Sequence, residues 1–137
     1  MGVSITATNS EYDFYMGYGG FFNLRKNVAL ALDREFGENY ALLSRCVTPR
    51  QFEENDAVAN ALITEKNLDE DVVEFLYASD CGGSVSYKTC RKIYDLIKDV
   101  DFGDKGFRYA AYRKDDYEDF KKFLLQCWSK RRRMRWE

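Results

Sequence analysis

The chain has 137 residues, 45 % of them apolar and 16 % aromatic, with 21 Lys and Arg against 23 Asp and Glu. This length and composition indicate a single domain over residues 1–137 and exclude a disordered chain. Because the sequence has no histidine, it excludes a Ser-His-Asp triad, a Cys-His pair and an imidazole metal ligand, and we expect no membrane-spanning segment.

The N-terminal part predicts one strand and one helix. Residues 3–8 alternate apolar and polar side chains, which is typical of a short strand, and residues 11–20 are expected to form a loop. Apolar side chains at helical spacing then predict a helix over residues 21–36, and Gly37 is placed to cap its C-terminal end. Residues 39–46 are ambiguous and could form a short helical turn.

Cap residues mark the starts of the next three helices. Thr48 followed by Pro49 combines an N-cap hydroxyl with a proline at the first helical position. Asp69 opens the following helix, and after a glycine-bearing turn over residues 79–84, Ser86 caps another. The apolar faces of these helices comprise Phe52, Ala59, Leu62 and Ile63, then Val72, Val73, Leu76 and Tyr77, then Cys90, Ile93, Tyr94 and Ile97.

The C-terminal part predicts an irregular connection, a long helix and a strand. Residues 101–112 form the connection, residues 114–130 the helix, and residues 133–136 could pair as a strand with residues 3–8. The inward face of the long helix comprises Tyr117, Phe120, Leu124, Cys127 and Trp128. The predicted fold class is therefore mainly α (α+β), with about five helices and a small two-stranded antiparallel sheet from the N- and C-terminal segments.

The four cysteines do not predict a metal site or disulfides. No two of them form a C-x-x-C pair, and without histidine they make a poor zinc set. Because the sequence shows no secretory signal, we expect reduced and buried thiols, no metal and no cofactor. The four are Cys46, Cys81, Cys90 and Cys127.

The segment from Tyr12 to Arg25 is rich in glycine and tyrosine and is the main candidate for a ligand-binding loop. Gly19 and Gly20 precede the predicted helix, where the backbone can approach a ligand and the free N–H groups of the helix end suit an anion. The segment lacks the lysine of a P-loop and the third glycine of a dinucleotide fingerprint. The alternative is a tight turn that packs aromatic rings under the helix.

Arg25 follows Leu24, beside the apolar face of the first predicted helix. A guanidinium so close to an apolar face needs a partner, because an unpaired buried charge is costly. That partner could be a carboxylate, from Asp13 or Asp80, or an anion bound at the glycine-bearing helix start. In the second case Arg25 would neutralise the ligand.

Two further segments could bind a ligand. In the turn over residues 79–84, Ser79 and Asp80 could hold a cation or a ligand hydroxyl, or Asp80 could bond to local N–H groups of an interhelical turn. The basic tail, residues 130–135, carries five of the 21 Lys and Arg and leaves the rest of the chain acidic. With Trp136 beside it, this tail could bind phosphates, or it could be a solvated end that balances the acidic body.

Two blocks of residues support a resemblance to known proteins. The blocks are Tyr18-Gly19-Gly20-Phe21 followed by Leu24-Arg25, and Ser79-Asp80-Cys81 with Gly83, Val85, Ser86 and Cys90. In the order and spacing of these blocks, the chain resembles a family of small, uncharacterised bacterial and phage or prophage proteins. Relatives often carry histidine at the position of Ala78 and acids at those of Gly82 and Ser84, so a metal role of those side chains would be lost here.

The resemblance to phage proteins implies, by analogy of genome context, a role against host defences. The function expected is a non-enzymatic binding protein, in the cytoplasm of the host bacterium, that sequesters a small anionic ligand such as a cyclic or ADP-ribose-type nucleotide. Phosphate would lie against the glycine backbone and a guanidinium, with tyrosine rings on the base. The expected binding residues are Tyr12, Asp13, Tyr18, Gly19, Gly20, Arg25, Ser79, Asp80 and Tyr109.

Alternatives to this function stay open at the level of the sequence. An inhibitor or adaptor of a host protein would present its aromatic rings on a flat exposed patch, whereas a ligand site would line a concave surface with them. A nucleic-acid binder would use the basic tail, and the sequence favours it less than the other two. Self-association into a homo-oligomer is also compatible with the sequence.

Overall fold

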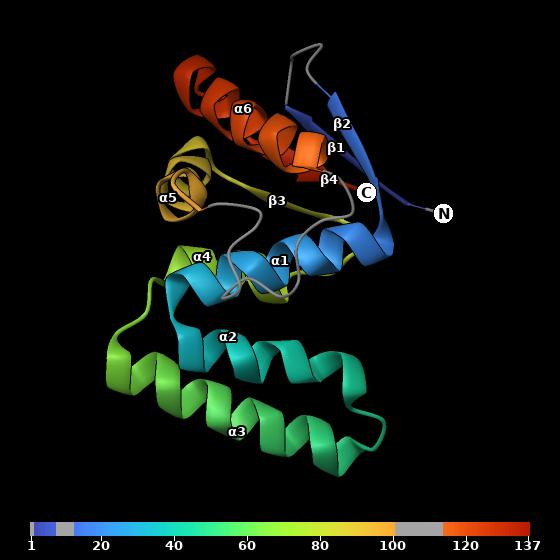
Figure 1. Ribbon diagram of the computed structural model, residues 1–137, viewed down its shortest axis with the longest axis vertical. Helices are drawn as coiled ribbons and strands as arrows, with labels where there is room; N and C mark the ends of the chain where they lie inside the picture. Colours follow the sequence, from blue (N-terminus) through green and yellow to red (C-terminus); the bar gives the residue numbers. More distant parts are fainter. Residues whose placement is uncertain (1, 8–12, 101–113) are drawn as a thin grey trace.

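The computed structural model describes residues 2–7, 13–100 and 114–137, with side chains over 3–7, 20–100 and 117–137 (Figure 1). The helices are α1 (Tyr18–Leu32), α2 (Arg34–Ala41), α3 (Pro49–Lys66), α4 (Glu70–Tyr77), α5 (Tyr87–Ile97) and α6 (Lys114–Lys130), with a 3-10 turn, η1 (Leu42–Arg45). The strands are β1 (Gly2–Ala7), β2 (Asp13–Gly17), β3 (Gly83–Val85) and β4 (Met134–Trp136). The fold is mainly helical with a small antiparallel sheet, which confirms the predicted fold class.

The sheet joins the two ends of the chain. Its strand order is β2-β1-β4-β3, and all neighbouring pairs are antiparallel. The predicted pairing of the N-terminal strand with the C-terminal strip is confirmed, since Ile5 lies opposite Trp136 and Ala7 opposite Met134. The expectation of two strands is too low, because β2 occupies the expected loop and β3 the expected turn. Neither edge strand is foreseen, since β2 shows no clear alternation and β3 has only three residues.

The sheet buries one face and exposes the other. In β4, Met134 and Trp136 are buried while Arg135 between them is exposed, and β1 shows the same alternation. Figure 1 shows α5 and α6 with the sheet at one end of the molecule, α1 and α4 in the middle, and α2 and α3 at the other end. The basic tail therefore lies at the end of the molecule opposite α3.

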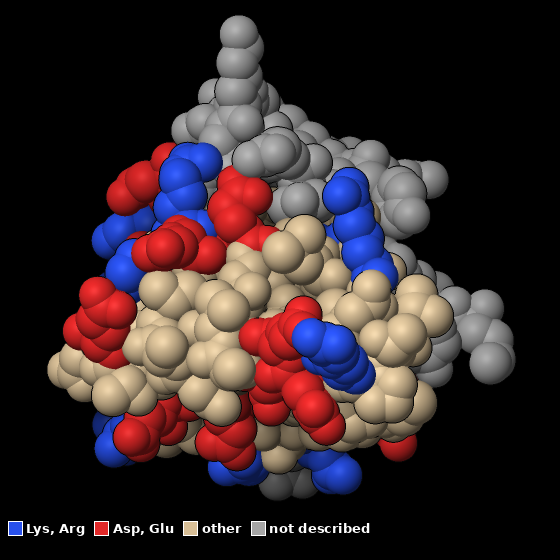
Figure 2. All heavy atoms as spheres, turned by 90° about the horizontal axis from the view of Figure 1, so that it is seen from below, with Lys and Arg blue, Asp and Glu red and all other residues tan. Residues whose placement is uncertain are grey.

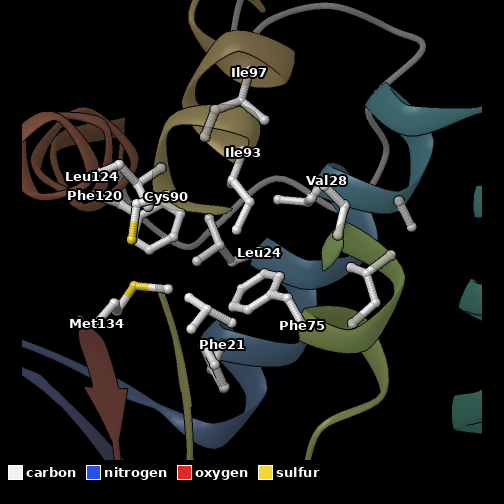
Figure 3. Close-up of a cluster of buried hydrophobic side chains, with 14 of the residues drawn as sticks. Phe21, Leu24, Val28, Phe75, Cys90, Ile93, Ile97, Phe120, Leu124 and Met134 are labelled. Atoms are coloured by element: carbon white, nitrogen blue, oxygen red, sulfur yellow. The ribbon is translucent and has the colours of Figure 1, made fainter. Parts of the chain in front are cut away.

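The hydrophobic core forms where α1, α4, α5, α6 and β4 meet (Figure 3). Most side chains of the predicted apolar faces are buried, but Phe52 is 46 % exposed, Tyr77 38 % and Trp128 37 %. Tyr77 and Trp128 each lie at the border of an apolar stripe, where the neighbouring residues Leu76 and Cys127 take the buried places. The inward position predicted for these three rings is therefore wrong.

The helix predicted over residues 21–36 is two helices. Asp33 separates α1 from α2 with an extended backbone, and its side chain accepts a hydrogen bond from the N–H of Phe36 at 2.9 Å. This N-cap starts a new helix in the middle of a continuous apolar stripe. Because Phe36 is buried like the apolar residues of α1, the periodicity alone does not reveal the break.

Gly37 lies inside α2, so the prediction that it caps a helix is wrong. A Cβ atom at this position would lie 2.6 Å from the Cα atom of Leu30 in α1. The glycine is therefore required by the close approach of two helices, which an apolar pattern does not predict.

The cysteines are free thiols, but they are not all buried. Cys90 and Cys127 are buried in the core, as expected. Cys81 is exposed on the turn before β3, and Cys46 is half-buried after η1. The expectation of burial is thus wrong for the two thiols that lie in connections between elements.

Candidate functional site

The structure describes the expected binding residues to different degrees. Tyr12 and Tyr109 lie outside the described residues. Only the backbone is described for the next three, Asp13 in β2 and Tyr18 and Gly19 in α1. Since β2 runs directly into α1, Gly19 and the buried Gly20 belong to the first turn of the helix rather than to a loop before it.

Arg25, Asp80 and the backbone beside Ser79 come together. The Arg25 side chain is only 3 % exposed, and its Nη1 atom donates to the carbonyl of Ala78 at 2.7 Å and to Oδ1 of Asp80 at 3.0 Å. The Asp80 side chain is 46 % exposed. Of the partners that the sequence allowed for Arg25, the structure contains the carboxylate of Asp80.

Aromatic rings enclose the rest of this guanidinium. The Cζ atom of Arg25 lies 4.3 Å from the centre of the Phe21 ring, 5.4 Å from that of Phe75 and 5.5 Å from that of Trp136. Its Nε and Nη2 atoms are buried without a hydrogen-bond partner among the described residues. Burial lowers the pKa of Arg25, although attraction to Tyr40 opposes the shift. The rings stabilise the cation where water is excluded.

Three side chains from different elements satisfy carbonyl groups at the C-terminal end of α4. Tyr40 donates from its hydroxyl to Leu76 O at 2.7 Å, and Trp136 donates from Nε1 to Ser79 O at 2.8 Å. The third bond is that of Arg25, described above. Such carbonyls have no partner within the helix, so these bonds hold the turn against α1, α2 and β4. The Ser79 hydroxyl accepts an N–H from two residues further on at 3.1 Å, and the whole cluster is a structural junction.

A second group of residues forms a hollow between the start of α5 and the end of α6. The hollow has a volume of about 400 Å³ and is lined by Tyr87, Lys88, Trp128, Ser129 and Arg131. The rings of Tyr87 and Trp128 lie 5.8 Å apart, and the Arg91 guanidinium lies 5.7 Å from the Trp128 ring. In the part of the chain that the structure describes, no carboxylate lies within ion-pair distance of Lys88 or Arg131. Two cations and a half-exposed indole ring thus line one concave surface.

Arg131 has an unusual backbone for its residue type, with a φ of 52° in the left-handed region. Its N–H bonds to Trp128 O at 3.2 Å and the N–H of Arg132 bonds to Cys127 O at 2.9 Å, which together form the Schellman motif that ends α6. Glycine is the usual residue at this position, and a side chain there costs about 1 kcal/mol. The chain keeps a cation where glycine would be more stable, and that cation lines the hollow.

The positive charge continues from the end of α6 into β4, through Arg133 before that strand and Arg135 within it. A second hollow of about 380 Å³ is lined by Cys81, Gly82, Gly83, Ser84, Arg135, Trp136 and Glu137. Ser84 lies opposite Arg135, and Arg133 donates from Nη2 to the Ser84 hydroxyl at 3.0 Å. Arg133 and Arg135 therefore share the exposed face of the sheet. We call the two hollows and the cations Lys88, Arg131, Arg133 and Arg135 the basic surface.

The opposite end of the molecule has a different character. Figure 2 shows it from below, where α3 lies, with uncharged residues over much of its middle and side chains of both charges around and among them. Val47 and Phe52, 82 % and 46 % exposed, occupy the N′ and N4 positions of α3, beside a capping box formed by Thr48 and Gln51. These are the positions at which the start of a helix favours apolar residues, although both side chains stay exposed here.

No comparison supplies a function for these surfaces: no family model, curated protein or solved structure matches the chain. Over the described ranges, no cluster of three or more Cys, Asp or Glu side chains could hold a metal ion. The helices described there also lack the combined length and apolar content needed to cross a bilayer. A functional assignment therefore depends on the geometry of the basic surface.

Sequence reasoning found the basic tail but missed the hollow beside it. Nothing in the sequence singles out Tyr87 or Lys88, because they meet Trp128 only when α5 packs against α6. One signal was available, since Arg131 stands directly after a predicted helix where a glycine is common.

Proposed function

We propose that this protein is a non-catalytic binding protein that holds a small anionic, nucleotide-type ligand in the hollow between α5 and α6. The observation that supports the proposal is the meeting of the half-exposed Trp128 ring with Lys88 and Arg131. A nucleobase can stack on an indole face, while ammonium and guanidinium groups bind phosphate. A volume of about 400 Å³ lies within the usual range for small-molecule sites.

This proposal moves the ligand away from Arg25, whose buried guanidinium is bonded to Ala78 and Asp80. It keeps the class of ligand that the sequence suggests, which includes cyclic and ADP-ribose-type nucleotides. In a phage setting, capture of such a nucleotide would withdraw an immune signal from the host. That last step rests on the family resemblance alone.

Titration of the purified protein with AMP, cyclic AMP and ADP-ribose tests the proposal. Binding of at least one of them should quench tryptophan fluorescence and raise the melting temperature. The Arg131→Gly variant should keep or raise the melting temperature of the free protein, because it relieves a left-handed arginine, and should abolish the ligand-induced rise. The Arg50→Ser variant is the control, since it removes an exposed positive charge on α3, away from the hollow.

A variant that unfolds would lose binding without any contact to the ligand. Arg131→Gly avoids this ambiguity, because we expect its stability to be kept or raised while its binding is lost. Failure of the wild type to bind any nucleotide, including the oligonucleotides described below, would overturn the proposal. Unchanged binding by Arg131→Gly would also overturn it, because the ligand would then lie elsewhere.

A further inference from the structure

The basic surface extends beyond what a single nucleotide would contact. Lys88 and Arg131 line the first hollow, but Arg133 and Arg135 lie further along the chain, on the exposed face of the sheet. Arg133 stands directly before β4 and Arg135 within it, and both lie beside Ser84, so these arginines form a short row that reaches the second hollow, which Arg135 lines. No carboxylate among the described residues forms an ion pair with Arg135.

We propose that the ligand is a short single strand of nucleic acid, with one base on Trp128 and its sugar–phosphate backbone running over Arg133 and Arg135 toward the second hollow. This inference rests on the proposed function, because the hollow between α5 and α6 is the first position of the strand. It names a larger ligand for the same site, and the second hollow becomes a place for the following nucleotide.

The aromatic ring selects a single strand over a duplex. Stacking on a side chain requires a base whose face is free, and proteins that bind single strands combine such rings with a basic groove along the backbone. The basic tail by itself favours nucleic acid only weakly, since a charged tail can be a solvated end. The structure adds that Trp128 lines the same hollow as Lys88 and Arg131, and this arrangement favours a nucleic-acid strand over a solvated tail.

The charge distribution limits the length of the strand. Outside residues 130–137 the chain has 16 Lys and Arg against 22 Asp and Glu, so the rest of the chain is net negative and we expect a longer strand to gain no further affinity. Four cations, Lys88, Arg131, Arg133 and Arg135, could neutralise about four phosphates. The logarithm of affinity should then fall with the logarithm of salt concentration with a slope of about −3, at roughly −0.7 per neutralised phosphate.

The experiment measures fluorescence anisotropy of labelled oligothymidylates of increasing length, with thymidine monophosphate and a duplex as competitors. We expect affinity to rise over the first few nucleotides and then level off, with little competition from the monophosphate. Arg135→Ser should weaken oligonucleotide binding by about tenfold and reduce the salt slope by about 0.7, while leaving nucleotide binding by the first hollow unchanged. Arg50→Ser should change neither, although it removes the same charge.

The outcomes separate this inference from the proposed function. If mononucleotide and oligonucleotide bind equally and Arg135→Ser changes neither affinity, the inference of a nucleic-acid strand is wrong and the proposed site for a small nucleotide is retained. If a duplex binds as well as a single strand and Trp128→Ala has no effect, the contact is electrostatic only and the inference is overturned. If the wild type binds neither kind of ligand, both proposals fall.

Discussion

Arg25 illustrates how a single charged residue can be buried for structural reasons. One end of its guanidinium bonds to Ala78 O and Asp80, and aromatic rings surround the cation. An arginine with these neighbours ties α1 to the end of α4 and to β4. Its position next to Leu24 correctly predicts the need for a partner, but the sequence could not decide between a carboxylate and a bound anion.

Arg25→Ala should lower the free energy of unfolding by about 2–4 kcal/mol, because it removes a buried hydrogen bond, an ion pair and the contacts of the side-chain stem. Asp80→Ala should cost less, about 1–2 kcal/mol, because it leaves the buried Arg25 cation without its carboxylate but removes only a half-exposed side chain. Urea denaturation of both variants measures the difference. Equal losses would show that the ion pair, and not the buried cation, stabilises the junction.

Two adjacent glycines, Gly82 before β3 and Gly83 at its start, should respond differently to the same substitution. A Cβ atom at Gly83 would overlap the ring of Trp136, which is buried and tied to Ser79 O, whereas at Gly82 the nearest atom would be a Trp136 oxygen at 3.9 Å. Gly83→Ala should therefore cost about 1–3 kcal/mol and Gly82→Ala much less. Thermal denaturation of the two variants checks this, and equal melting temperatures would contradict the close packing of Gly83 on Trp136.

At the scale of elements, local signals predicted helix starts well and helix ends less well. The N-caps at Thr48, Asp69 and Ser86 stand where the sequence places them, and at Thr48 the structure adds a capping box with Gln51. The break at Asp33 was missed because Phe36 continues the apolar stripe across a change of helix axis. The edge strands β2 and β3 form because they pair with β1 and β4, and the apolar periodicity of a single segment cannot predict its pairing with another.

Asp33 should make the stability of the α1–α2 junction depend on pH. Burial alone would raise the pKa of Asp33, but bonds from Phe36 N–H and Lys66 outweigh it and leave the pKa lowered. A carboxyl whose folded pKa is lowered stabilises the fold above its unfolded pKa of about 3.9, and this contribution is lost as the pH falls from that value through the lower folded pKa. Asp33→Asn should keep the cap but lose part of this acid sensitivity, and Asp33→Ala should also lose about 1 kcal/mol of cap stability.

Urea denaturation at about pH 7 and about pH 3.5 measures both effects of the Asp33 variants. The difference in stability between wild type and Asp33→Asn should narrow at the lower pH. A constant difference at both values would mean that the charge of Asp33 contributes nothing to stability.

At the scale of the whole molecule, the candidate site shows where sequence reasoning ends. The basic tail is visible in the composition of residues 130–135, but the hollow needs α5 and α6 to be side by side. The same packing decides which of the adjacent residues Cys127 and Trp128 is exposed. Helical spacing alone would allow either Cys127 or Trp128 to be buried, and the position of α5 decides that it is Cys127.

The distribution of thiols over the molecule predicts an order of chemical reactivity. Cys81 is exposed and Cys46 half-buried, so both should react with N-ethylmaleimide in the native protein, Cys81 first. Cys90 and Cys127 are both buried in the core, so this pair should react only when the protein unfolds; a hydrogen bond to Cys127 and burial also raise the pKa of the Cys90 thiol. Mass spectrometry of the labelled protein follows the order. Denatured protein without reductant should show four free thiols, and a smaller number would reveal a disulfide.

The central pairing of β1 with β4 has a consequence for the order of folding. Until residues 134–136 leave the ribosome, the β1–β2 hairpin and β3 have no strand between them, and the apolar side of β1 lacks the Trp136 and Met134 neighbours that complete its layer. Contacts between such distant segments slow folding. The helices can therefore form early in synthesis, while closure of the sheet waits for residues 134–136.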